Sequence, residues 1–132
     1  MQKNQPCPCD SGKEFSSCCE PLVLLQSPAE TPEALMRSRY TAFTLKNMDY
    51  VRQTTDPQVV FEIDWKSNQE WAEKSRFVKL EILQSTNEGN KGIVEFKAHF
   101  ISEGSSEPQI HHELSKFRKQ SGKWYFRDGK VL

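Results

Sequence analysis

The chain has 132 residues, of which 36% are hydrophobic and 11% aromatic, so it holds about one domain with apolar mass for one core. These figures exclude a disordered chain, a collagen and a multi-domain machine. Lysine and arginine total 18, equal to aspartate and glutamate, which excludes a polycation that coats nucleic acid or membrane but leaves room for a local patch.

The sequence predicts no membrane segment. Its longest apolar run, Leu22 to Leu25, is far shorter than the roughly 18 residues that a spanning helix needs. Residues 1–5 lack the apolar core of a signal peptide. We therefore expect a cytoplasmic protein with no membrane partner.

All four cysteines lie in the first nineteen residues, as two close pairs, Cys7 with Cys9 and Cys18 with Cys19. A disulfide within either pair would be strained, and cytoplasmic thiols stay reduced. Gly12, between the pairs, can adopt a left-handed turn, and a helical turn after it would return the second pair to the first. This spacing favours a tetrahedral zinc site over reactive or disulfide-forming thiols. Four unrelated buried cysteines would not explain the clustering.

The same stretch resembles a known zinc motif. Residues 7–19 read CPCDSGKEFSSCC, and the SEC-C motif reads CPCGSGKx[YF]xxC[CH]. The departure is Asp10 where glycine is usual, and aspartate tolerates turns. The resemblance implies that zinc is the cofactor, and its ligands would be Cys7, Cys9, Cys18 and Cys19. SEC-C knuckles elsewhere are associated with protein and ribosome contacts, which by analogy implies a similar role here.

Residues 20–31 form a connector that contains the run Leu22 to Leu25. Four exposed aliphatic side chains in a row would favour aggregation, so we expect this run to pack the knuckle onto the main body. The predicted organisation is a zinc knuckle with its connector over residues 1–30 and a second domain over residues 31–132.

Two helices are expected at the start of the second domain. Thr31-Pro32 combines an N-cap hydroxyl with proline at the first helical position, and apolar residues then recur at helical spacing to about residue 46. Asn47 or Asp49 is expected to cap a shorter helix that reaches Gln53. Residues 58–76 give no clear pattern, and their two tryptophans are expected to face the core or a common pocket.

From residue 77 the apolar period changes to two, which predicts strands. Short turns separate four of them, over residues 77–83, 92–102, 109–120 and 123–127. On the first strand, apolar Val78, Leu80 and Ile82 are expected to share one face, with Lys79 and Glu81 on the other. Helices followed by an antiparallel meander predict an α+β fold.

Three further stretches, Thr31–Phe43, His112–Phe117 and Trp124–Gly129, resemble the YchJ-like family of small bacterial proteins. With the knuckle, the resemblance spans nearly the whole chain. It implies a nuclear-transport-factor-2-like core, in which a cone of helices packs against a curved four-stranded antiparallel sheet. It implies no established reaction.

The third strand carries the candidate pocket residues. Alternation places His111, Glu113 and Ser115 on one face, and a curved sheet often lines a pocket under its helices. His111 and Glu113 could form an acid–base pair, with Arg39 from the first helix orienting Glu113. A structural Glu–Arg pair explains the same residues and is favoured over ligand binding and catalysis. We assign no catalytic residue and favour a protein that is not an enzyme.

Charge is unevenly distributed along the chain. Residues 1–31 hold two basic and four acidic residues, a net of −2, whereas residues 114–132 hold six basic and one acidic, a net of +5.

The leading hypothesis is a non-catalytic zinc-binding adaptor that recognises a protein partner through its knuckle. The alternatives are a small-ligand or weakly catalytic pocket, and RNA or ribosome contact through the basic C-terminal strands.

Overall fold

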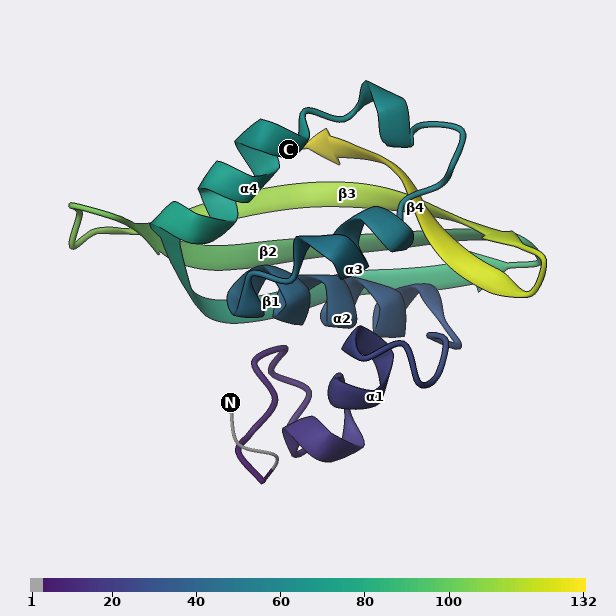
Figure 1. Ribbon diagram of the computed structural model, residues 1–132, viewed down its shortest axis with the longest axis horizontal. Helices are drawn as coiled ribbons and strands as arrows, with labels where there is room; N and C mark the ends of the chain where they lie inside the picture. The colour runs from purple at the N-terminus through teal and green to yellow at the C-terminus, as the bar shows by residue number, and fades with distance from the viewer. Residues whose placement is uncertain (1–3) are drawn as a thin grey trace.

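The computed structural model describes residues 4–132, so the first three residues of the predicted N-terminal unit, Lys3 among them, lie outside the described range. The helices are α1 (Glu20–Val23), α2 (Pro32–Leu45), α3 (Met48–Gln53) and α4 (Trp65–Lys74), with short 3₁₀ turns η1 (Phe15–Ser17) and η2 (Val60–Glu62). The strands are β1 (Ser75–Glu88), β2 (Lys91–Ser102), β3 (Pro108–Gln120) and β4 (Lys123–Val131). In Figure 1 the strands form one elongated layer, and the N-terminal segment lies next to α2. The predicted α+β class is confirmed.

The helices begin at the capping residues that the sequence supplies. The hydroxyl of Thr31 accepts a 3.0 Å hydrogen bond from the backbone nitrogen of Ala34, and Pro32 is the first residue of α2. Asn47 caps α3 through a 3.1 Å hydrogen bond from the backbone nitrogen of Tyr50. Both helices expected here are confirmed, and Asn47 is the cap of the second one.

The segment without a clear pattern contains η2 and α4. The carboxylate of Asp64 caps α4 by accepting a 3.0 Å hydrogen bond from the backbone nitrogen of Ser67. Trp65 and Trp71 are half-buried on this helix and line one cavity, so of the two expected placements, core or common pocket, the structure has the pocket.

The sheet is a simple antiparallel meander with the order β1-β2-β3-β4, as predicted. Strand β1 is longer than predicted, and its register shifts between Phe77 and Lys79. This bulge leaves Val78 unpaired and 43% exposed, while Phe77 packs against the core and Leu80 is buried. The expectation that Val78 shares a face with Leu80 is wrong, because a bulge interrupts the alternation of side chains along a strand.

The core lies between α2 and the sheet. Leu35 from α2 and Val94 from β2 are fully buried, and Trp124 from β4 is 4% exposed. Gly92 on β2 allows a close approach, since a Cβ atom there would collide with the ring of Pro32. The start of α2 is therefore seated directly on β2.

Among the helices described over residues 4–132, none is long and apolar enough to cross a membrane.

Candidate functional site

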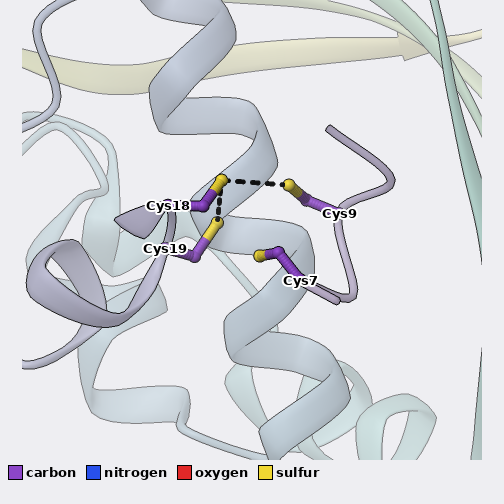
Figure 2. Close-up of side chains that lie close together, drawn as sticks. All are labelled: Cys7, Cys9, Cys18 and Cys19. Atoms are coloured by element: carbon purple, nitrogen blue, oxygen red, sulfur yellow. Dashed lines mark hydrogen bonds between the residues drawn. The ribbon is translucent and has the colours of Figure 1, made fainter. Parts of the chain in front are cut away.

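The four cysteine sulfur atoms converge on one point. Every pair of Sγ atoms lies within 4.8 Å, with 3.6 Å between Cys9 and Cys18 and 3.9 Å between Cys18 and Cys19. Figure 2 shows the two pairs facing each other from separate segments of chain. A regular tetrahedron with metal–sulfur bonds of about 2.3 Å has edges of roughly 3.8 Å. The donor set and its spacing therefore fit a metal ion held by four thiolates.

The turn between the pairs returns the chain to its starting point. The backbone nitrogen of Cys7 donates a 2.9 Å hydrogen bond to the carbonyl of Lys13. Gly12 has a φ of +87°, which confirms the left-handed turn predicted there, and Asp10 has a φ of +61°. The turn η1 then delivers Cys18, whose sulfur lies 3.1 Å from the hydroxyl of Ser11.

Three polar contacts fix the knuckle, residues 4–19, onto α2 and β1. Arg37 on α2 donates a 2.7 Å hydrogen bond to the carbonyl of Cys9. The sulfur of Cys7 lies 3.8 Å from the hydroxyl of Thr41, also on α2. The carboxylate of Asp10 accepts a hydrogen bond from β1. The candidate metal centre is thus anchored on a helix and on a strand edge.

The connector contributes less packing than expected. In the run Leu22 to Leu25, Val23 is buried and Leu22 is half-buried, but Leu24 and Leu25 are 55% and 57% exposed. The expectation that the whole run packs is wrong for these last two residues. Because α1 is a single turn that ends at Val23 and Leu25 has a left-handed φ of +61°, the run cannot present all four side chains to one surface.

The thiols in this cluster strongly influence one another. Hydrogen bonds from Cys19 and Cys7 lower the pKa of Cys9, whereas hydrogen bonds raise the pKa of Cys19. Burial raises the pKa of Cys18 to about 11. A bound dication would favour the thiolate form of all four residues and displace the remaining protons.

A second feature is a cavity of about 520 Å³ between α2, α4 and the concave side of the sheet. The four residues proposed from the sequence, Arg39, His111, Glu113 and Ser115, all line it. Glu113 accepts a 2.8 Å hydrogen bond from Nε2 of His111 and a 2.5 Å hydrogen bond from the hydroxyl of Ser115. The expected face of β3 therefore forms one hydrogen-bonded group.

Arg39 does not orient Glu113 as expected. Its Nη1 atom donates to the carbonyl of Val51 at 2.8 Å and to the hydroxyls of Thr54 and Thr55 at 2.8 and 3.3 Å. No ion pair joins Arg39 to Glu113 in the described part of the chain. Instead, the guanidinium group donates hydrogen bonds to the carbonyl of Val51 on α3 and to the hydroxyls of Thr54 and Thr55, which follow this helix.

Both groups nevertheless carry charge at neutral pH. Burial lowers the pKa of Arg39 to about 10, which still leaves the guanidinium protonated. Burial raises the pKa of Glu113, but hydrogen bonds from His111 and Ser115 outweigh it and hold that pKa below its usual range. The cavity thus contains a buried cation, Arg39, and a half-buried anion, Glu113, which are not paired with each other. The group at ion-pair distance from Glu113 is His111.

Apart from Trp65 and Trp71, the aromatic walls of this cavity were not predicted from the sequence. The rings lie on α2, α4 and the strands, and they are Tyr40, Phe43, Trp65, Trp71, Phe77, Phe96 and Phe126. In the sequence, these rings follow the same helical spacing and strand alternation that predict a buried core. Only the space left between α2 and α4 distinguishes a cavity wall from a filled core.

The basic C-terminal strands are partly neutralised. Asp56 is buried and lies between Arg118 and Arg127, with Nη2 of Arg118 and Nη1 of Arg127 each 3.1 Å from a carboxylate oxygen. Burial raises the pKa of Asp56, but its hydrogen bonds and the two arginines lower it overall. Two of the six basic residues in this region therefore form ion pairs with Asp56 inside the protein.

Comparisons with known proteins agree with this architecture. A family model described as "YchJ, middle NTF2-like domain" matches residues 31–129, and the SEC-C motif matches residues 4–21. A UPF0225 protein of Geobacter sulfurreducens is 46% identical over 126 residues, covering 93% of this chain and 77% of that protein.

Two solved structures extend the likeness to three dimensions. A SEC-C motif containing protein from Rhodopseudomonas palustris has a TM-score of 0.89 at 46% identity and covers 96% of this chain and 98% of its own. A second, from Psychrobacter arcticus, has a TM-score of 0.81 at 32% identity and covers 98% of this chain and 84% of its own. The chain therefore belongs to the YchJ-like family, with a SEC-C motif preceding a nuclear-transport-factor-2-like domain.

Proposed function

We propose that the protein is a cytoplasmic zinc-binding module in which Cys7, Cys9, Cys18 and Cys19 hold one Zn²⁺ ion. The convergence of four sulfur atoms within 4.8 Å carries this proposal. An all-sulfur tetrahedral set suits zinc and leaves no coordination position for water or substrate. The metal would therefore stabilise a surface, and its role would be structural.

We further propose that this surface binds a protein partner without catalysis. A hollow of about 430 Å³ lies beside Cys18 and is bounded by the knuckle and α2. Lys13 is exposed at its rim, and Arg37 lines it from the helix. The SEC-C motif in this chain supports the choice of partner only by analogy with knuckles elsewhere.

Native mass spectrometry with and without a chelator tests the metal assignment. We expect one zinc ion per chain in the protein purified under reducing conditions, and its loss after chelation. Cys9→Ser should prevent loading, because Cys9 is fully buried in the cluster. A metal-free protein with free thiols after purification in the presence of zinc would overturn the assignment.

Capture experiments with zinc-loaded protein test the partner surface. Lys13→Glu reverses one charge at the rim of the hollow, and Lys66→Glu reverses an exposed charge on α4 as a matched control. We expect the first variant to lose a partner that the second retains. Equal capture by both variants, with zinc bound in each, would show that this face of the knuckle is not the contact surface.

RNA or ribosome contact through the C-terminal strands has weaker support. Arg118 and Arg127 are bound to Asp56, so the half-buried Lys119 and the exposed Lys116, Lys123 and Lys130 carry the remaining charge. Lysines on an edge strand also protect it from pairing with other chains. The knuckle is therefore the better candidate for partner recognition.

A further inference from the structure

The cavity between α2, α4 and the sheet has the dimensions of a small-molecule site. Its volume of about 520 Å³ falls in the range of roughly 300–1,000 Å³ that is usual for ligand pockets. It is separate from the cysteine cluster, whose residues do not line it. What the cavity can hold is set by its walls and by its polar groups.

The walls favour a flat, apolar ring. Trp71 packs edge-on against Phe77 with ring centroids 5.0 Å apart, and against Phe100 with centroids 5.4 Å apart. Phe43 packs edge-on against Trp71 at 5.4 Å. Rings held in this way form a preorganised wall, so a planar guest can stack there without first ordering the side chains.

The polar groups offer both a donor and an acceptor. In the described chain, Nη1 is the atom of Arg39 that hydrogen-bonds to protein, which leaves its other N–H groups as donors beside the cavity. The carboxylate of Glu113 receives one hydrogen bond on each oxygen and keeps lone pairs that can accept more.

Arg39 and Glu113 carry opposite charges and are not in contact, and His111 lies 2.8 Å from the carboxylate of Glu113. A guest with a net charge would be attracted by one of the two groups and repelled by the other, and this repulsion is costly in a site largely shielded from water. A neutral guest that accepts from Arg39 and donates to Glu113 would satisfy both groups.

We propose that this cavity binds a small uncharged aromatic carboxamide or lactam, with the carbonyl oxygen at Arg39, the N–H group at Glu113 and the ring against Trp71. The aromatic walls select the ring, and the two separate, opposite charges of Arg39 and Glu113 select the neutral donor–acceptor head group. The proposal does not depend on the metal centre.

Three probes that share one ring system test the proposal on the zinc-loaded full chain. They are naphthalene-2-carboxamide, which is neutral, 2-naphthoate, which is an anion, and naphthalene-2-carboxamidine, which is a cation. Calorimetry or saturation-transfer NMR gives their relative affinities. We expect the carboxamide to bind at least tenfold more tightly than either ion. Tighter or equal binding of an ion, or binding of none of the three, would overturn the proposal.

A change of one charge supplies a second readout. Glu113→Gln keeps the size of the side chain but leaves Arg39 unbalanced, so the preference should shift from the carboxamide to 2-naphthoate. Glu95→Gln is the matched control, because Glu95 accepts a 2.7 Å hydrogen bond from His112 on the opposite face of the sheet. An unchanged ranking in Glu113→Gln, or the same shift in Glu95→Gln, would contradict the assigned site. The ranking on the unmodified chain remains decisive if Glu113→Gln does not fold.

Discussion

The carboxylate of Asp10 accepts a 2.8 Å hydrogen bond from the backbone nitrogen of Leu80, a residue 70 positions later in the chain. This N–H group belongs to β1, an edge strand of the sheet, where unpaired backbone groups can recruit other chains. Asp10 occupies the position where the SEC-C motif usually has glycine. The departure from the motif therefore ties the knuckle to the sheet.

Asp10 accepts a hydrogen bond from β1 and also has a left-handed backbone conformation. Replacing it by glycine should separate the effects of these two features on stability. Asp10→Gly loses the hydrogen bond, which costs about 1 kcal/mol, and relieves the left-handed backbone by about the same amount. We expect a change of less than ~1 kcal/mol in the free energy of unfolding, together with faster hydrogen exchange of the Leu80 amide.

Asp10→Ala is the control, since it loses the hydrogen bond without gaining backbone freedom. It should be less stable than Asp10→Gly by about 1 kcal/mol in urea denaturation. Unchanged protection of the Leu80 amide in both variants would contradict the docking role of Asp10.

Local patterns predicted much of this structure. Thr31 and Asn47 each cap a helix by accepting a hydrogen bond from a residue three positions later, so the starts of these helices could be located from the sequence. The four cysteines lie within one short stretch, and alternation along β3 placed His111, Glu113 and Ser115 on one face.

Features that depend on a distant partner were not predictable. The bulge at Val78 exists only in relation to β2, and the hydrogen bond from Leu80 to Asp10 joins two separate units. The partners of Arg39 were not predicted, because nothing in the sequence indicates that oxygens at the end of α3 and just after it surround its Nη1 atom. The cavity itself depends on how far α4 lies from α2.

Removal of the metal should unfold the knuckle and spare the sheet. Leu35, Val94 and Trp124 are buried between α2 and the strands without any contribution from zinc, whereas the knuckle has few buried side chains besides its cysteines and Phe15. After chelation, two-dimensional NMR should show loss of dispersion for residues 4–19 and retention for β2 and β3. Collapse of the whole spectrum would show that the metal centre supports the entire fold.

Asp56 should make stability depend on pH in the acid range. Because its folded pKa is lowered, its contribution is present above its unfolded pKa of about 4 and is lost as the pH falls below that value. Asp56→Asn should lower the free energy of unfolding by about 2 kcal/mol at neutral pH, because Arg118 and Arg127 lose their negatively charged partner. Both arginines are partly exposed, so water limits this loss.

The difference between wild type and Asp56→Asn should therefore narrow as the pH falls through 4, measured by urea denaturation at several pH values. Asp128→Asn, at an exposed position on β4, is expected to have little effect throughout. A constant difference between wild type and Asp56→Asn at all pH values would contradict the electrostatic explanation.

Gly129 should be required for the position of Glu113. The register of β4 shifts near Arg127, and this shift places Gly129 directly opposite Ser115. A Cβ atom at Gly129 would collide with the carboxylate of Glu113. Gly129→Ala should therefore displace that carboxylate from its hydrogen bonds with His111 and Ser115, destabilise the protein by about 1 kcal/mol and weaken binding of the carboxamide probe.

A double-mutant cycle separates this collision from a general effect on β4. Glu113→Ala removes the atoms that a Cβ at position 129 would meet. In that background, Gly129→Ala should therefore lower the free energy of unfolding by much less. The coupling between the two positions should be about 1 kcal/mol or more, measured by urea denaturation. Additive effects would mean that the alanine strains β4 itself, and the glycine would then have no role in placing Glu113.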